Sequence, residues 1–271
     1  MMPYENELQV ALEAVHRAGE AIMADYAHFE VVPDAPASIT TATDRRSQEI
    51  ILQCLQKAFP ADGLCAEETT ETLAQAVRTG PRLWIVDPID GTRGFARKLG
   101  EFSVMVALWD PDGIAVGVVS EPAHGRLTYA VRGNGCWRQD ASETMAQPCR
   151  VTHVADLAAA TLTQSHSRKP NAPSRQLQAL HPMRILETYS AGIKLALVAR
   201  GEADLYLNTY DSCHDWDICA GQILVEEAGG RVTNLLGQKP QYGLSGAVQH
   251  HGLLASNGIL HEAALASLRN Q

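Results

Sequence analysis

The feature of this sequence that most constrains its fold is an apolar run at residues 83–86 that stops at two aspartates. The run Leu-Trp-Ile-Val, with β-branched members, predicts a buried strand. Pro88 and Gly91 break the strand where Asp87 and Asp90 stand. We therefore expect a strand end that presents two carboxylates side by side.

The residues after this strand suggest what the carboxylates do. Gly91 and Thr92 head a short run that can start a helix, whose free N–H groups and positive dipole end form an anion site. Carboxylate and carbonyl oxygens suit Mg²⁺, and Mn²⁺ is also allowed. The pattern favours divalent cations that hold a phosphate. Asp-Pro and Asp-Gly are also ordinary turn dipeptides, so a plain surface turn is the alternative.

Composition limits the class of protein. With 271 residues, 45% of them apolar, the chain can bury a sizeable core as one or two domains. A formal charge of −9, without a dense Lys/Arg stripe, argues against a nucleic-acid polymer as partner. Any phosphate would be bound locally, as part of a small molecule.

Cysteine usage and hydropathy indicate where the protein works. The six cysteines are scattered without a CxxC pair, as expected of reduced thiols in a cytosolic enzyme. The N-terminal residues carry acids rather than an apolar signal core, and no uncharged run approaches membrane-spanning length. We predict a cytoplasmic protein with no membrane partner.

The sequence pattern of the first half of the chain predicts two helices and an antiparallel sheet. Apolar periodicity indicates an amphipathic helix over 5–29 and a second helix from about Asp44. After the strand at 83–86, the strand-and-turn units predict a meander with strands at 104–109, 114–119 and 127–131. A polar break at 139–148 suggests a boundary between an α+β half, 1–140, and an α/β half, 141–271.

The second half alternates strands and helices, which suits an α/β layer with a mixed sheet. Expected strands lie at 161–163, 183–186, 205–207 and 231–233, and expected helices at 172–180, 191–200 and 216–228. The last of these helices ends at a Gly-Gly pair, a typical C-terminal stop. The fold class is therefore α/β.

Two motifs resemble the inositol monophosphatase superfamily. Trp84 to Phe95 reads Trp-Ile-Val-Asp-Pro-Ile-Asp-Gly-Thr-Arg-Gly-Phe, and Trp216 begins Trp-Asp-Ile-Cys-Ala-Gly, followed by Glu-Ala-Gly-Gly from Glu227. Both are similar to signatures of these Mg²⁺-dependent, Li⁺-sensitive phosphomonoesterases, and the likeness extends over nearly the whole chain. It implies the layered αβαβα sandwich shared with fructose bisphosphatases.

The resemblance implies a metal-ligand set from three distant places in the chain. It comprises four carboxylates and one backbone carbonyl, those of Glu67, Asp87, Asp90, Asp217 and Ile89. The set would hold two or three Mg²⁺ ions, of which two about 4 Å apart can activate a water and stabilise a leaving oxygen. Glu67 ranks above its neighbour Glu68, although paired glutamates are commonly a solvated face.

The resemblance also implies the remaining catalytic groups. Thr92 and Glu67 would orient the attacking water, and Asp44 would join Thr92 in bonding to it. Asp44 is equally well placed as a helix N-cap, and both roles can coexist. The amides of Gly91 and Thr92 would hold the phosphate. His214 lies near the last motif and is expected to be a packing or rim residue.

Further segments resemble the 3'(2'),5'-bisphosphate nucleotidase branch. These are Lys98 to Val104, with Gly-Glu-Phe-Ser-Val, the Ser-His pair ending at His166, and the Gly-containing turn of Gly192 before Lys194. A His and a Lys beside an anion site could neutralise a second phosphate, as in 3'-phosphoadenosine 5'-phosphate. The sequence departs from the branch at Ser190 and at 206–212, which has neither the expected Arg nor Glu.

Other substrates and roles stay open. Lys194 could be a solvated helix lysine, with Arg93 serving as the phosphate clamp. The rival activities are inositol-1-monophosphatase and another sugar or polyol phosphatase, and the rival class is a non-catalytic metal- or phosphate-binding protein. Homodimers are common among such relatives, so the resemblance allows a homodimer.

Overall fold

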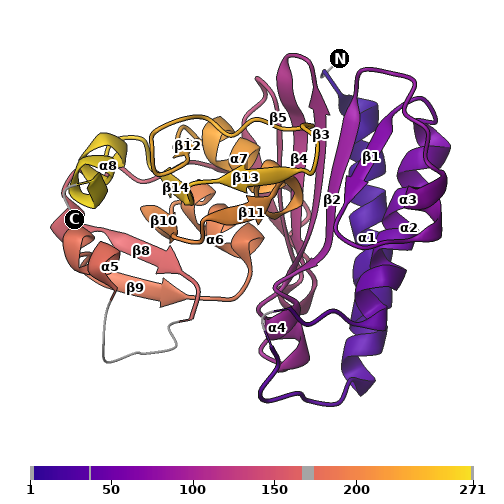
Figure 1. Cartoon of the computed structure of the whole chain (residues 1–271), viewed down its shortest axis with the longest axis horizontal. Coiled ribbons are helices and arrows are strands. Elements are labelled where there is room, and N and C mark those ends of the chain that lie inside the picture. Colours follow the sequence, from indigo (N-terminus) through magenta and orange to yellow (C-terminus); the bar gives the residue numbers. More distant parts are fainter. Residues whose placement is uncertain (1–2, 37, 167–173, 270–271) are drawn as a thin grey trace.

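The computed structural model describes residues 3–36, 38–166 and 174–269, and it stacks them in five layers of alternating helix and sheet (Figure 1). A helical layer covers the outer face of a large sheet, two helices lie between that sheet and a smaller one, and two further helices close the other end. This arrangement is the predicted layered α/β sandwich.

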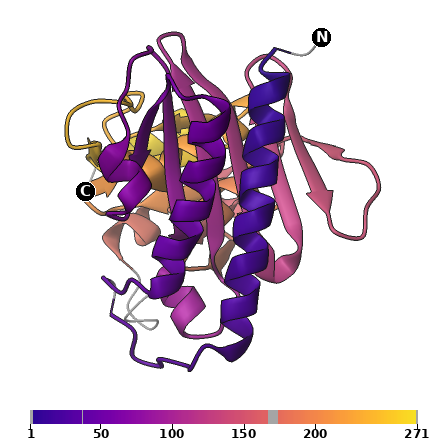
Figure 2. The same cartoon turned by 90° about the vertical axis from the view of Figure 1, so that its right-hand side faces the viewer.

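The outer helical layer consists of α1 (Glu5–His28), α2 (Ala42–Ala58) and the short α3 (Glu71–Gln75). Figure 2 shows α1 and α2 side by side against the sheet. Helix α2 begins in a capping box: the side chain of Thr41 accepts from the amide of Thr43, and Asp44 accepts from the amide of Thr41 at 2.9 Å. The prediction that Asp44 is the N-cap was therefore wrong, because Thr41 takes that position and Asp44 lies three residues later.

The large sheet has seven strands in sequence order, and only its first pair is parallel. Its members are β1 (Gly63–Ala66), β2 (Leu83–Asp90), β3 (Ser103–Asp110), β4 (Gly113–Glu121), β5 (Arg126–Val131), β6 (Cys136–Asp140) and β7 (Gln147–Cys149). The five-residue helix α4 (Thr92–Ala96) follows β2 directly, and a 3₁₀ turn (Pro122–His124) follows β4. The expected meander is confirmed, and it is two strands longer than predicted.

A bulge in β2 decides where its two carboxylates point. Asp87 pairs with Met105 of β3, and Asp90 pairs with Ser103, so three steps on β2 match two on β3. In a regular strand, residues three apart face opposite sides of the sheet. The extra residue brings Asp87 and Asp90 to the same side, and Pro88 in the strand marks the bulge.

The middle layer contains α6 (Ala191–Ala199) and α7 (Asp215–Glu227). Helix α7 lies close against β4 at Gly117, where an added Cβ would come within 2.3 Å of Ile223. Apolar side chains from the sheet, α6 and α7 form one core cluster, and those beneath α1 and α2 form another. The two clusters hold the large sheet between layers, so the end of β2 has a fixed position.

The smaller sheet is mixed and has the order β12-β14-β10-β8-β9. Its strands are β8 (Thr161–Gln164), β9 (Arg184–Glu187), β10 (Leu205–Asn208), β12 (Arg231–Thr233) and β14 (Leu253–Ser256). A separate pair comprises β11 (Ser212–His214) and β13 (Val248–His250), a 3₁₀ turn spans Leu157–Ala159, and the last layer comprises α5 (Arg175–Leu180) and α8 (His261–Arg269). Residues 172–173 of the predicted helix 172–180 lie outside the described residues.

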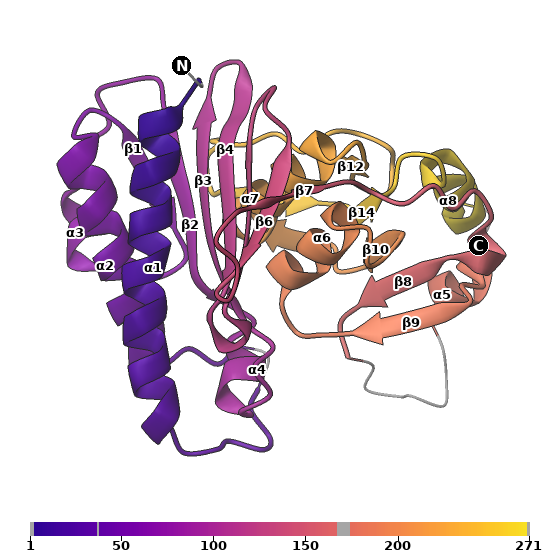
Figure 3. The ribbon, with the colours of Figure 1, turned by 180° about the vertical axis from the view of Figure 1, so that it is seen from behind.

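The two halves of the chain join at the edge of the large sheet. Figure 3 shows β6 and β7 leading into the connection that reaches β8. The large sheet continues to Cys149, so by sheet membership the change falls later than the predicted boundary after residue 140. Of the described residues, none belongs to a helix that is both long and apolar enough to span a membrane.

Candidate active site

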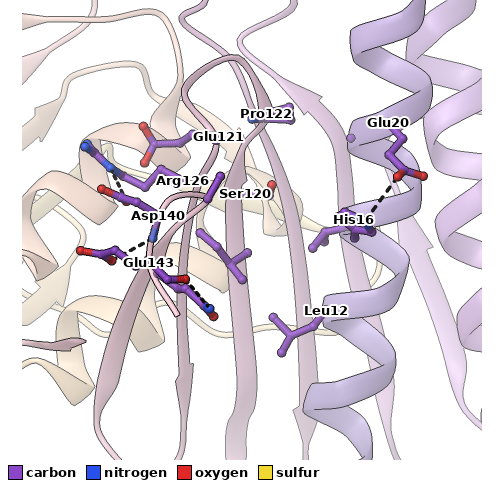
Figure 4. Close-up of a pocket in the computed structure, with 15 residues that line it drawn as sticks. Leu12, His16, Glu20, Ser120, Glu121, Pro122, Arg126, Asp140 and Glu143 are labelled. Carbon is purple, nitrogen blue, oxygen red and sulfur yellow. Dashed lines mark hydrogen bonds and ion pairs between the residues drawn. The ribbon is translucent and has the colours of Figure 1, made fainter. Parts of the chain in front are cut away.

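The predicted carboxylates line one cavity of about 600 Å³ between the two halves. Glu67, Asp87, Asp90 and Asp217 all contribute to it, with Ile89, Gly91 and Thr92. A second cavity, of about 480 Å³, lies between α1 and the outer strands. Figure 4 shows its walls, with Leu12, His16 and Glu20 on the helix side facing Arg126 and Asp140, and none of the predicted site residues lines it.

Asp90 joins the two halves through hydrogen bonds. Its carboxylate accepts from the amides of Ala191 at 3.0 Å and Gly192 at 2.6 Å, the first residues of α6. The hydroxyl of Ser190 also donates to it, as does that of Ser103 at 3.1 Å. A helix N-terminus favours a negative charge. The end of β2 is therefore tied to a helix whose sequence lies 100 residues later.

The two serines set the orientation of Asp90, and Ser103 tests this role without removing the N-cap of α6. We expect Ser103→Ala to weaken Mg²⁺ binding about tenfold, because groups that orient a metal ligand are typically worth this much. Calorimetric titration of the metal-free protein with Mg²⁺ measures the effect. Ser120→Ala on the neighbouring strand is the matched control. An unchanged Mg²⁺ affinity in Ser103→Ala would contradict the role.

Burial and neighbouring negative charge raise the pKa values of Asp217, Glu67 and Asp87. Burial raises the pKa of Asp217 to about 7 and that of Glu67 to about 8, and Asp217 adds negative charge next to Glu67. The pKa of Asp87 lies well above its ordinary value because the carboxyl is buried and faces Glu67 and Asp90. A hydrogen bond joins Glu67 to Asp87. Glu67 thus points toward the aspartates from the mouth of the cavity, where part of the residue still reaches solvent.

This donor set fits hard divalent cations. The cavity gathers four carboxylates that repel one another, and cations would remove that repulsion and lower their pKa values. Among the described residues, no three His, Cys, Asp or Glu side chains yet stand close enough around one point to hold an ion. The four acids line the cavity but do not yet surround one point, and ion binding would draw them closer together.

Asp44 and Thr92 form a hydrogen-bonded pair behind the acids. The Thr92 hydroxyl lies 2.9 Å from Oδ1 of Asp44 and 3.0 Å from the carbonyl of Ile89, and can donate to either. Asp44 is fully buried, and this burial raises its pKa, against the opposing effect of hydrogen bonds from Thr41 and Thr92. The Thr92 oxygen keeps a lone pair that can accept a hydrogen bond from a water molecule.

The predicted phosphate-binding residues stand at the start of α4. Gly91 is the N-cap with a φ of 89°, a left-handed conformation that favours glycine. An added Cβ would lie 2.7 Å from the carbonyl oxygen of Glu101, so the position also lacks space for a side chain. Gly91 and Thr92 line the cavity beside the carboxylates, as the sequence predicted.

The predicted substrate-binding residues lie in different settings. Arg93, His166 and Lys194 line the cavity, whereas the amide of Gly192 is bonded to Asp90. Lys194 is 1% exposed, and its ammonium donates to Ser165, Thr188 and Tyr189 at 2.9–3.3 Å. Burial lowers its pKa to about 8. The alternative of a solvated helix lysine was therefore wrong.

Tyr189 is a cavity residue that the sequence reasoning missed. Its ring lies 4.5 Å from that of His166, and the guanidinium groups of Arg93 and Arg97 lie over it at 5.2 and 5.7 Å. His166 also contacts Glu101 at 2.7 Å. An aromatic residue directly before a helix N-cap was the available signal. His214 stacks on Trp216 with a centroid distance of 4.5 Å, which fits the expected packing role.

Comparisons with known proteins extend over the whole chain. The model of the inositol monophosphatase family matches residues 4–271. The chain is 33% identical to a histidinol-phosphatase of Mycobacterium tuberculosis, covering 97% of this chain and 98% of the relative. It is 27% identical to a fructose-1,6-bisphosphatase/inositol-1-monophosphatase of Thermotoga maritima, covering 95% and 93%. A solved IMPase structure from Thermotoga maritima superposes with a TM-score of 0.81 at 27% identity, covering 98% and 97%.

Proposed function

The chain belongs to the inositol monophosphatase family of metal-dependent phosphatases, and we propose that it uses Mg²⁺ to hydrolyse a small ring-bearing phosphate monoester, with histidinol phosphate as the first candidate. The observation that carries the substrate choice is the composition of the cavity wall beside the acids. The family supports a catalytic role, so the non-catalytic alternative is set aside.

The proposed ligands are those that line the cavity: Glu67, Asp87, Asp90, Asp217 and the carbonyl of Ile89. When bound there, Mg²⁺ would neutralise phosphate charge and make a water more acidic. The four carboxylates and the one carbonyl offer enough oxygen atoms to bind two or three ions.

Thr92 would position the attacking water. Because its hydroxyl donates to Asp44 or Ile89, its oxygen is free to accept from a water on the cavity side. Glu67 at the mouth of the cavity would accept a hydrogen bond from the other O–H of that water. The amides of Gly91 and Thr92 would hold phosphate oxygens at the start of α4.

The substrate wall is rich in aromatic side chains and also includes the cations Arg93 and Lys194. His166, Tyr189, Tyr206, Asn208 and Tyr210 line it together. Such side chains suit the flat ring of a leaving alcohol. This wall, and the name of the 33% identical relative, support histidinol phosphate.

The bisphosphate nucleotidase hypothesis has weaker support. Lys194, which would neutralise a second phosphate, is buried and bonded to three protein oxygens. Lys194 nevertheless lines the cavity with Arg93, and these two cations are the observation that favours a second anionic group. Inositol phosphate is the third candidate, from the relatives' names.

The test is phosphate release with Mg²⁺ from histidinol phosphate, inositol 1-phosphate and 3'-phosphoadenosine 5'-phosphate, compared by kcat/KM. We expect the first to be favoured at least tenfold. A preference for either of the others would overturn the substrate choice. Absence of turnover with all three substrates would count against the phosphatase assignment itself.

Tyr210 offers a specific prediction, because it is 64% exposed at the cavity and removing its ring leaves no void in the core. We expect Tyr210→Ala to raise KM for histidinol phosphate about fivefold, the value of one aromatic contact. Turnover of β-glycerophosphate, which has no ring, should be unchanged. Tyr210→Phe is the control, and equal KM values in all three proteins would contradict ring stacking.

Two further proposals concern location and assembly. All six cysteines are free, which supports a reducing, cytoplasmic location. A homodimer stays a proposal by analogy with the family.

A further inference from the structure

Cys136 and Cys149 face one another at the edge of the large sheet. They are direct partners in the antiparallel pairing of β6 and β7, and their exposed fractions are 0% and 4%. Cα atoms of such partners lie about 4.5–5.5 Å apart, within the range of about 4.4–6.8 Å that a disulfide spans. We propose that this pair is a thiol modification site, which a low-molecular-weight disulfide oxidises to an intramolecular disulfide.

Two arginines near the pair, the part-exposed Arg138 and the buried Arg200, carry hydrogen-bond donors without a partner among the described residues. Arg138 lies two residues after Cys136 and thus on the same face of β6, and Arg200 ends α6. Nε of Arg138 and Nη2 of Arg200 are buried and have no hydrogen-bond partner among the described residues. A buried donor without an acceptor is costly. A negatively charged sulfur beside these arginines would be an acceptor.

The remaining guanidinium atoms are held in place. Arg200 donates to Glu121 at 2.6 Å and to Glu202 at 2.8 Å, and Arg138 pairs with Asp140 at 2.8 Å. These ion pairs fix both positive charges next to the thiols. The charge therefore cannot swing away into solvent when a cysteine ionises.

The environment makes the two cysteines unequal. A hydrogen bond between the thiols lowers the pKa of Cys149 and raises that of Cys136, and the charges of Arg200 and Arg138 also lower the pKa of Cys149, against the opposing effects of burial and of Glu202. A thiolate is the attacking form in disulfide exchange. Cys149 is thus the nucleophile, and Cys136 is the thiol that resolves the intermediate.

The reaction balances with one equivalent of a small disulfide. The Cys149 thiolate attacks one sulfur, the sulfur–sulfur bond of the reagent breaks, and one thiol leaves with a proton from solvent. Cys136 then loses its proton to solvent and attacks the Cys149 sulfur, releasing the second thiol. Two protein thiols are oxidised to one disulfide, and one disulfide is reduced to two thiols.

The position of the pair at the sheet edge explains how a reagent can reach it and what a disulfide there would change. β7 has three residues and pairs only with β6 within the described sheets, so it can open more easily than an inner strand. The chain leaves β7 for β8 in the other sheet. A disulfide here would fix the start of the connection between the two halves.

The first experiment counts thiols. Purified full-length protein with Mg²⁺ is treated with 2-hydroxyethyl disulfide, then denatured, alkylated and analysed by mass spectrometry. We expect two of the six thiols to escape alkylation and one cross-linked peptide pair to contain residues 136 and 149. The melting temperature should rise by roughly 5 °C. Six alkylated thiols, or a cross-link between other cysteines, would overturn the proposal.

Variants then test the assignment of roles. Cys136→Ser should retain one hydroxyethyl adduct on Cys149, because nothing resolves it, whereas Cys149→Ser should leave Cys136 unmodified. Arg138→Gln should slow the reaction about tenfold relative to Arg126→Gln, an arginine of the same ion-pair group. Equal modification of the two serine variants, or equal rates in the two arginine variants, would refute the assigned chemistry.

Discussion

Asp90→Asn is expected to lower kcat/KM by about 10³-fold while leaving the fold intact. The carboxylate lies in the cavity with Asp87, Glu67 and Asp217, and the amide that replaces it carries no charge to hold a cation. Asparagine has the same shape, and its oxygen can still accept from the amide of Gly192 at the start of α6. The measurement is phosphate release at saturating Mg²⁺.

The loss must come from the site rather than from unfolding. Asn presents an N–H group where one carboxylate oxygen accepts from Ala191, so we expect a loss of about 1–2 kcal/mol in unfolding free energy. Circular dichroism and thermal unfolding check that the variant is folded at the assay temperature. Asp112→Asn, in the exposed turn between β3 and β4, should keep full activity. Activity of Asp90→Asn within tenfold of the parent protein would show that Asp90 is not an essential ligand.

The position of this aspartate shows what sequence reasoning could reach. The strand at 83–86 and the two following carboxylates were predicted from the apolar run and from Pro88 and Gly91. Their common face depends on the bulge, which is visible only in the register of β2 against β3. The contact with α6 depends on folding of the second half over the first, which local periodicity does not encode.

The elements that were missed share a physical cause. β7 is the edge strand and β6 is its only neighbour within the described sheets, and both are short and polar, so they lack the apolar signal of an inner strand. β13, β14 and α8 follow the last predicted strand, in a region to which no element was assigned. The alternative of an exposed Lys194 was wrong because its helix is almost wholly buried between the two sheets, which the local sequence does not reveal. The predicted ligand and substrate roles stay predictions.

The metal-free protein is expected to lose stability as pH rises from about 5 to about 8. In the folded state the pKa values of Glu67, about 8, and Asp217, about 7, lie above the unfolded value of roughly 4, and those of Asp87 and Asp44 are also raised. The folded chain therefore binds more protons in this window, and its stability falls as they dissociate. The melting temperature in EDTA should drop by roughly 5–10 °C.

Mg²⁺ should remove this dependence, because a cation that takes the place of the protons stabilises the ionised carboxylates. With saturating Mg²⁺ we expect a flat or rising melting temperature over the same range, and proton release on binding at pH 7. Calorimetric titrations in buffers with different ionisation enthalpies measure that release. Asp87→Asn, which lacks one of the buried acids of the group, should show a shallower pH slope and release fewer protons. A metal-free protein whose stability is constant or rises toward pH 8 would mean that these carboxylates are not crowded into one cavity.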